Sequence, residues 1–390
     1  MSGFVSRTVR GIPYSGIRKF FDIASEMKDV VSLGVGEPDF ATPWRIREEA
    51  IYSLERRRTM YTSNAGMPEL RAEISRYMSS RYGLSYNPAT QILVTVGASE
   101  GIDAALRAVV DPGDEVLVCE PCFVSYKPCV TLAGGVPVPV QARAENGFRV
   151  AAADITARIT NKTKAITLSY PNNPTGAILE RGDLDEIAGT LREREIAVVS
   201  DEIYSELTYG GTDHASIASA PGMSGRTVVI NGFSKSYAMT GWRLGYACGP
   251  EDIIAAMTKI HQYIVMCAPT TAQYAGIEAL RSGAEGVAAM RLEYDARRRY
   301  MLGELRLMGI DCFDARGAFY LFPSIAQFGL TADEFCERLL REEKLAVVPG
   351  AAFGECGEGY VRCSYAYSID SIKEALSRLR AFINKIRRTR

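Results

Sequence analysis

Residues 227–243 read TVVINGFSKSYAMTGWR, and this stretch indicates the fold. Its first part, Thr227–Asn231, is a run of β-branched and apolar residues, which is typical of a strand buried on both faces. A polar turn with a lysine follows at once. Because ligands of open α/β sheets bind beyond the carboxyl ends of the strands, Ser234, Lys235 and Arg243 are candidates for a binding site.

The same alternation of apolar run, turn and helical pattern occurs along most of the chain. The other apolar runs are Ile92–Val96, Glu115–Cys119, Val136–Val140, Ala165–Ser169, Ala197–Ser200 and Leu244–Cys248. Helical patterns cover Glu100–Val110, Arg181–Arg194 and roughly Glu251–Leu280. Apolar strands that alternate with helices favour an α/β fold, with a mainly parallel sheet between two layers of helices.

The two ends of the chain have a different pattern. From about Glu285 long helices replace most strands, up to the amphipathic stretch Ile369–Ile386, and a further helix is expected over Ser15–Lys28. We predict three parts: an N-terminal arm over residues 1–45 that joins a smaller α+β domain, a large domain over 46–285, and the rest of the small domain over 286–390.

The composition is that of a globular protein, with 47% hydrophobic and 23% charged residues in 390, which excludes disorder. No apolar run approaches the length of a membrane span. Because 45 Lys and Arg face 46 Asp and Glu, no overall charge attracts nucleic acid or an anionic membrane. The N-terminus lacks a secretion-type apolar segment, so a cytoplasmic location is expected. The nine cysteines are expected as free thiols, and with only two histidines no metal site is expected.

Other strand ends also carry polar chemistry. Ala98 and Ser99 open a helix whose N-terminus suits an anion. Asn173 follows Ala165–Ser169, and Asp201 and Tyr204 follow the next strand. Each residue alone has an ordinary explanation as a cap, a turn or a solvated charge, so the ordered set carries the prediction. Because nucleotide-binding glycine motifs are absent, the expected anion is a monophosphate.

A serine hydrolase is an alternative interpretation. Gly97–Gly101 fits the G-x-S-x-G motif between a strand and a helix, with Ser99 as nucleophile. Asp201 with His214 or His261 then supplies the acid and the base in the required order. However, His214 lies in a polar loop and His261 within a helix, and the lysine after the strand is left without a role.

Three longer motifs join these residues: Asn173–Gly176 (NPTG), Ser200–Tyr204 (SDEIY) and Ser234–Gly245 (SKSYAMTGWRLG). Together they resemble the class I/II aminotransferases, pyridoxal-phosphate enzymes of fold type I. The likeness covers nearly the whole chain, through Ser15–Phe20, Gly34–Phe40 and Gly359–Arg362. Within the family the chain is most similar to bacterial N-acetyl-diaminopimelate aminotransferases, through Asp201–Tyr209 and Gly317–Ile325.

The resemblance implies three catalytic residues. Lys235 forms a Schiff base with the cofactor aldehyde and then moves the substrate's α-proton. Asp201 pairs with the protonated ring nitrogen, which makes the ring an electron sink. Tyr204, together with Asn173, hydrogen-bonds the phenolate oxygen of the cofactor.

The resemblance also implies how the rest of the cofactor is held. The phosphate lies at the helix N-terminus formed by Ala98 and Ser99, with Ser234 and Arg243 completing its site. Phe123 stacks on the cofactor ring. Tyr61 resembles a tyrosine that the neighbouring subunit donates to the phosphate, which implies a homodimer with shared active sites.

For the substrate, Arg362 resembles the arginine that binds the α-carboxylate with its planar fork. Gly36, Asn173 and Ile17 are expected to line the same pocket, and whether Arg18 or Lys19 contacts the substrate side chain stays open. Aspartate-preferring relatives carry a lysine where this chain has Ser99, which argues against aspartate.

The expected activity is transfer of an amino group between an amino acid and a 2-oxo acid in amino acid biosynthesis. The resemblance implies 2-oxoglutarate and glutamate as one pair, and N-acetyl-diaminopimelate or another amino acid as the other partner. A carbon–sulfur β-lyase of the same fold is the alternative, because it uses the same lysine, aspartate and arginine.

Overall fold

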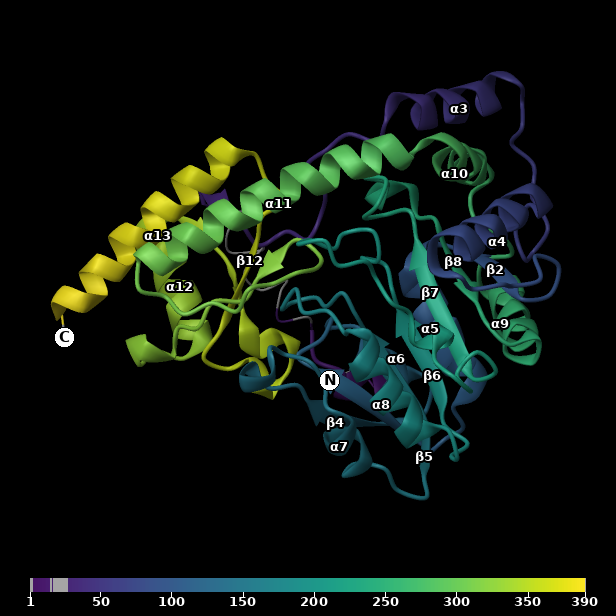
Figure 1. The fold of residues 1–390 in the computed structure, drawn as a ribbon, viewed down its shortest axis with the longest axis horizontal. Coiled ribbons are helices and arrows are strands. Elements are labelled where there is room, and N and C mark those ends of the chain that lie inside the picture. The colour runs from purple at the N-terminus through teal and green to yellow at the C-terminus, as the bar shows by residue number, and fades with distance from the viewer. Residues whose placement is uncertain (1–2, 15, 17–26, 390) are drawn as a thin grey trace.

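The computed structural model describes residues 3–14, 16 and 27–389. Within them a seven-stranded sheet has the order β2-β8-β7-β6-β5-β3-β4 (Figure 1). Its strands are β2 (Ile92–Thr95), β3 (Glu115–Glu120), β4 (Val136–Gln141), β5 (Thr163–Ser169), β6 (Ala197–Asp201), β7 (Thr227–Gly232) and β8 (Gly245–Cys248). Strands β4, β3, β5, β6 and β7 are parallel, and β8 runs antiparallel to both of its neighbours. The expected mixed, mainly parallel α/β sheet is therefore confirmed.

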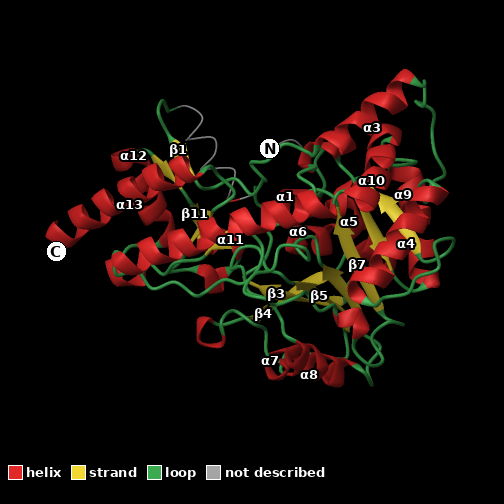
Figure 2. Cartoon of the chain, turned by 45° about the horizontal axis from the view of Figure 1, so that its top comes forward, coloured by secondary structure: helices red, strands yellow, loops and turns green. Residues whose placement is uncertain are grey.

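The apolar strands are buried because helices cover both faces of the sheet (Figure 2). Alternate residues of β3 point to opposite sides: Val116 and Val118 pack in one core cluster and Leu117 in the other. The helices around this sheet are α3 (Trp44–Glu55), α4 (Pro68–Tyr82), α5 (Gly97–Val109), α6 (Tyr126–Leu132), α7 (Ala152–Thr156), α8 (Arg181–Leu191), α9 (Glu251–Ile264) and α10 (Thr270–Ser282).

One expected helix is two helices in the structure. The pattern over Glu251–Leu280 is broken between α9 and α10, where Met266 has a φ of 69° and Pro269 caps the second helix. Proline has no amide hydrogen for the helical ladder, so the chain turns there and begins a new helix. The helical pattern expected over Glu251–Leu280 is therefore present, with an interruption at this point.

Both ends of the chain build a second group of elements. Strand β1 (Val31–Ser32) pairs in parallel with β10 (Leu345–Ala346), so the N-terminal region lies beside the C-terminal one. A three-stranded sheet contains β11 (Val348–Pro349), β12 (Val361–Ser364) and β9 (Tyr320–Leu321). Helices α11 (Ala284–Leu307), α12 (Ala332–Glu343) and α13 (Ile369–Thr389) pack with them in one apolar cluster. The long α11 runs from α10 beside the large sheet to α12 and α13 (Figure 1).

The remaining described elements are short. Helix α1 (Arg7–Gly11) begins with the side chain of Ser6 accepting a hydrogen bond from Val9. Turns of 3-10 helix lie at Ala144–Asn146, Ile217–Ser219, Thr240–Trp242, Ala326–Phe328, Gly350–Phe353 and Glu355–Gly357. Nearly all of the helix expected over Ser15–Lys28, with Ile17, Arg18 and Lys19, lies outside the described residues.

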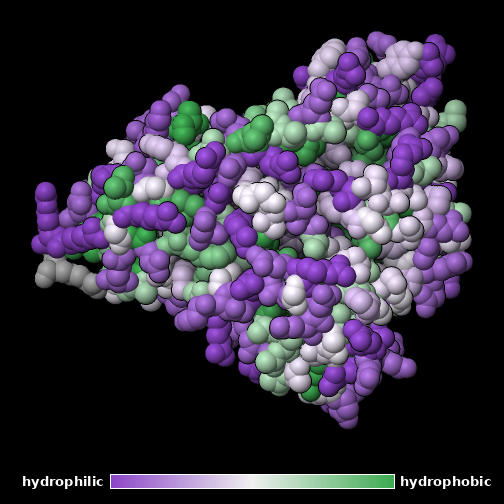
Figure 3. Space-filling model, viewed as in Figure 1, coloured by the Kyte–Doolittle hydropathy of each residue, from purple (hydrophilic) through white to green (hydrophobic). Residues whose placement is uncertain are grey.

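The surface drawn in Figure 3 is mostly polar, with small apolar groups between the charged side chains. Among the helices of the described residues, none combines the length and the apolar character that crossing a membrane requires.

Candidate active site

A cavity of about 300 Å³ lies beyond the carboxyl ends of β5, β6 and β7, where such folds bind ligands. It brings together eleven of the residues named from the sequence: Gly36, Ala98, Ser99, Phe123, Asn173, Asp201, Tyr204, Ser234, Lys235, Arg243 and Arg362. The large sheet supplies most of them. Arg362 comes from β12 of the second group, so the cavity lies between the two groups of elements.

The amine of Lys235 faces the N-terminal segment of the chain. Its Nζ donates a hydrogen bond to the backbone oxygen of Gly36 at 2.7 Å and lies about 6 Å from the rings of Tyr204 and Phe319. Burial lowers the pKa of Lys235 to about 8, and the positive charges of Arg362 and Arg243 act in the same direction. The amine therefore loses its proton far more readily than an exposed lysine does.

The carboxylate of Asp201 is buried at the end of β6. Its Oδ2 accepts a hydrogen bond from the Tyr126 hydroxyl at 2.7 Å, and its Oδ1 accepts one from the backbone amide of Ile203 at 3.1 Å. Burial raises the pKa of Asp201, while these two hydrogen bonds act in the opposite direction. The two hydrogen bonds thus fix the orientation of both oxygens of the Asp201 carboxylate.

The N-terminus of α5 forms the anion-binding end of the cavity. Gly97 has a φ of 78°, a conformation that favours glycine, and it lets the free amides of the next residues face the cavity. The guanidinium of Arg243 packs on Gly97 so closely that a Cβ there would overlap it. Arg243 also donates to the backbone oxygen of Thr240 at 2.9 Å. With Ser234, these groups give a positive, donor-rich pocket for a phosphate.

Arg362 is almost fully buried, with 3% of its surface exposed. Its guanidinium lies between the rings of Tyr320 and Phe353, at 4.5 and 4.8 Å from their centroids. It donates to Asn173 Oδ1 at 2.8 Å and to the backbone oxygen of Gly34 at 2.5 Å. Its Nε has no partner among the described residues. A buried guanidinium with an unused donor is suited to a carboxylate ligand.

Tyr204 and Tyr320 also line the cavity, next to Arg362. Their hydroxyls are 2.8 Å apart and hydrogen-bonded. Gly36 lies against the Tyr320 hydroxyl, and a Cβ at position 36 would overlap it. This tyrosine therefore contacts Gly36, Tyr204 and Arg362 together.

The loop after β5 positions Asn173 through its neighbour Asn172. The Asn172 Oδ1 accepts hydrogen bonds from the amide and the hydroxyl of Thr175 at 3.0 and 2.8 Å. Its amide group donates to the backbone oxygens of Pro121 and Ser169. The first asparagine fixes the loop and leaves the Asn173 side chain free to face the cavity.

Two of the named residues are not seen at the cavity. Tyr61 lies on the surface with 80% of its area exposed, beside Met60 and Thr270. This is compatible with a role in a neighbouring subunit, which stays a prediction. Ile17 lies outside the described residues.

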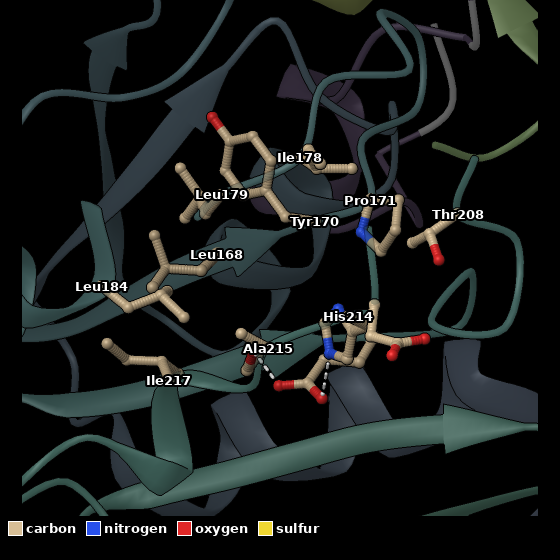
Figure 4. A pocket seen from close by; sticks show the side chains of 13 residues that line it. Leu168, Tyr170, Pro171, Ile178, Leu179, Leu184, Thr208, His214, Ala215 and Ile217 are labelled. Atoms are coloured by element: carbon tan, nitrogen blue, oxygen red, sulfur yellow. Dashed lines mark hydrogen bonds and ion pairs between the residues drawn. The ribbon is translucent and has the colours of Figure 1, made fainter. Parts of the chain in front are cut away.

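The hydrolase interpretation is not supported by the positions of the histidines. His214 Nε2 lies 2.8 Å from the buried Glu202 carboxylate, in a small separate cavity that Leu168 also lines (Figure 4). His261 Nδ1 lies 2.7 Å from Glu100. Of the described residues that line the cavity with Ser99, none is a histidine. No histidine of the described residues is therefore placed to activate the Ser99 hydroxyl in the way a Ser-His-Asp hydrolase requires.

The sequence interpretation missed several lining residues, above all Tyr126 and Tyr320. Tyr126 begins α6, three positions after Phe123, and only tertiary structure shows that its hydroxyl turns toward Asp201. Tyr320 lies inside the stretch 317–325 that already marked the family resemblance, which is the signal that could have identified it.

Comparisons with known proteins agree with this site. The model of the family "Aminotransferase class I and II" matches residues 28–379, and the chain belongs to this family. The putative aminotransferase YugH of Bacillus subtilis is 52% identical over 99% of this chain and 100% of its own length. A probable N-acetyl-LL-diaminopimelate aminotransferase of the same organism is 42% identical, over 99% of this chain and 98% of that one. The solved aspartate aminotransferase of Thermus thermophilus with maleate is 37% identical, with a TM-score of 0.93 over 98% of this chain and 100% of that one.

The chain is therefore an aminotransferase of fold type I, and enzymes of this family use pyridoxal phosphate. The cavity fits that cofactor by the chemistry of its donors. An amine with a lowered pKa, a buried carboxylate and a phosphate-binding helix N-terminus line one space. The overlap that a Cβ at Gly97 would cause shows how closely the phosphate end is built.

Proposed function

We propose that this aminotransferase uses 2-oxoglutarate and glutamate as one substrate pair and N-acetyl-diaminopimelate, or another amino acid, as the other partner. The placement of Lys235, Asp201 and Arg362 around one cavity is the observation that supports chemistry on an amino acid at this site. The similarity to a probable N-acetyl-LL-diaminopimelate aminotransferase supports this donor. The family resemblance implies a lysine at the Ser99 position of aspartate-preferring enzymes, so Ser99 argues against aspartate.

Each residue has a proposed task. Pyridoxal phosphate, when bound, withdraws electrons from the α-carbon of the amino acid and carries the amino group between the two half-reactions. Lys235 Nζ would take the proton from the substrate α-carbon and deliver it to the cofactor, a transfer that its lowered pKa favours. Asp201 supplies a fixed negative charge at the ring nitrogen. Arg362 binds the α-carboxylate and so orients the C–H bond toward Lys235.

The remaining residues are proposed to bind the cofactor and to position Arg362. Ser234, Arg243 and the amides of Ala98 and Ser99 bind the phosphate through charge-assisted hydrogen bonds, each worth about 1.5–3 kcal/mol. Phe123, which lines the cavity, would pack against the cofactor ring. Asn173 and Tyr204 donate to the phenolate oxygen, and Asn173 also positions Arg362 through their 2.8 Å hydrogen bond.

We further propose that two subunits share each active site through Tyr61. Its exposed ring and the neighbouring Met60, also 80% exposed, provide an apolar surface around the donated residue. The surface residues Tyr263 and Ile264 on α9 add to the apolar area that association would bury.

The function is tested with the purified protein loaded with pyridoxal phosphate. Glutamate, aspartate, an aromatic amino acid and N-acetyl-diaminopimelate are each offered with a 2-oxo acid, and product amino acid is measured. We expect the highest kcat/KM for N-acetyl-diaminopimelate with 2-oxoglutarate, and no turnover by Lys235→Ala. A clear preference for aspartate would refute the proposed donor. Release of pyruvate and ammonia from a thioether amino acid, without transfer, would instead identify a β-lyase.

A further inference from the structure

Tyr126 is the one side chain hydrogen-bonded to the Asp201 carboxylate among the contacts of the described residues. Its ring is 98% buried at the first turn of α6 and makes an edge contact with Phe123 at 6.1 Å. Its hydroxyl donates to Asp201 Oδ2 at 2.7 Å. Ser169, at the end of β5, also interacts with this hydroxyl and acts to lower the pKa of Tyr126, against the effect of burial. Ser169, Tyr126 and Asp201 thus form a short polar chain along the cavity wall.

We propose that Tyr126 is a positioning residue that keeps the Asp201 carboxylate ionised and oriented for the cofactor ring. The proposal rests on the proposed role of Asp201. Tyr126 lines the same cavity, and its proposed effect on the cofactor ring passes through the carboxylate that it hydrogen-bonds. Residues of β5, α6 and β6 then together fix the position of the Asp201 carboxylate.

The surroundings of Asp201 explain why such a donor is needed. Burial favours the protonated acid, and the neighbouring Glu202 repels a second negative charge. Lys235, after β7, attracts the carboxylate only from a distance, and the Ile203 amide occupies the other oxygen. The Tyr126 hydroxyl therefore supplies the stabilisation that a single backbone hydrogen bond leaves incomplete.

The direction of the Tyr126 hydrogen bond is also fixed. A hydroxyl has one proton to donate, and a serine that donates to its oxygen leaves that proton for the carboxylate. Burial raises the pKa of Tyr126 well above its ordinary value, so the group stays a donor at all working pH values. The pair cannot exchange roles without protonating Asp201.

The test compares Tyr126→Phe with the wild type. The substitution removes one oxygen and keeps the ring contact with Phe123. In the full-length apoprotein, the Asp201 carboxyl is followed by ¹³C NMR, with Asp201→Asn to assign its signal. We expect the pKa of Asp201 to rise by roughly one to two units. In the loaded enzyme, the acid limb of kcat/KM against pH is expected to move in the same direction, with weaker cofactor binding.

Tyr246→Phe is the matched control, because it removes a buried tyrosine hydroxyl whose partner is the sulfur of Met78. It is expected to leave the Asp201 signal and the acid limb unchanged. Ser169→Ala, which removes the donor to Tyr126, is expected to give a smaller shift of the same sign. If Tyr126→Phe does not fold, the pKa of Asp201 in Ser169→Ala tests the proposal instead.

An Asp201 pKa that is unchanged in both variants would overturn the proposal. Because this pKa is measured in the apoprotein, the result does not depend on which amino acid the enzyme uses. A shifted pKa with an unchanged acid limb would show that Asp201 does not govern the limb, which contradicts the catalytic half of the proposal.

Discussion

Lys235 is a buried cation in the apoprotein, and this has a cost. Its pKa in the folded chain is about 8, below the ordinary value of 10.5. Between these values the unfolded chain binds more protons than the folded one, so stability rises with pH in this window. Below pH 8 the charge is present in both states and the folded state carries the full penalty.

We therefore expect Lys235→Met to stabilise the apoprotein at pH 7 by up to about 3 kcal/mol. The advantage over the wild type is expected to shrink as pH rises from 8 and to be lost near pH 10.5. Urea unfolding of both apoproteins across this range checks the expectation. A difference that stays constant with pH would show that packing, and not the charge, causes it.

Arg362 illustrates how one side chain is fixed by several weak restraints. Contacts with two aromatic rings and hydrogen bonds to two oxygen acceptors fix the position and orientation of its guanidinium. Arg362→Lys keeps the charge and loses the planar fork. We expect kcat/KM for the amino acid to fall by roughly 10- to 100-fold, while the dissociation constant of pyridoxal phosphate stays within twofold. Steady-state kinetics and cofactor titration by absorbance measure the two quantities, and weaker cofactor binding with unchanged kinetics would contradict the assignment.

At the scale of elements, the first turn of α5 controls the phosphate site. Gly97→Ala is expected to strain a backbone with a φ of 78° and to displace the Arg243 guanidinium. We expect a cofactor dissociation constant at least tenfold larger, measured by absorbance titration. Gly113→Ala is the control, because Gly113 has a φ of 94° with no atom within 4 Å of the added Cβ. It is expected to lower stability by about 1 kcal/mol without changing cofactor affinity.

Most of the strands and helices, and the polar residues at the ends of the strands, could be predicted from the sequence. The apolar strands and the polar residues at their ends carry local signals, so Asp201, Lys235 and the N-terminus of α5 were expected to converge, and they line one cavity. The break between α9 and α10 was missed, although Pro269 marks it. Tyr126 and Tyr320 carry no local signal of their contacts, because their hydrogen bonds join residues 75 and 116 positions away.

At the scale of the whole molecule, the proposed sharing of sites can be tested by mixing subunits. Lys235→Ala and Tyr61→Ala are each expected to be nearly inactive as homodimers. In a mixed dimer one site carries both defects and the other carries neither, provided that Tyr61 acts across the interface. Co-expression with two affinity tags isolates this species, and we expect up to half of the wild-type activity per dimer. If Tyr61 served its own subunit, the mixed dimer would stay inactive.

The position of Arg362 on β12 also affects how the enzyme is made. A ribosome releases every residue of the phosphate and ring pocket, from Gly97 to Arg243, long before it releases the last strand. Regions nearer the N-terminus fold first during synthesis. The nascent chain thus exposes its own cofactor-binding residues before Arg362 has been synthesised, and the arginine that recognises the amino acid is added last.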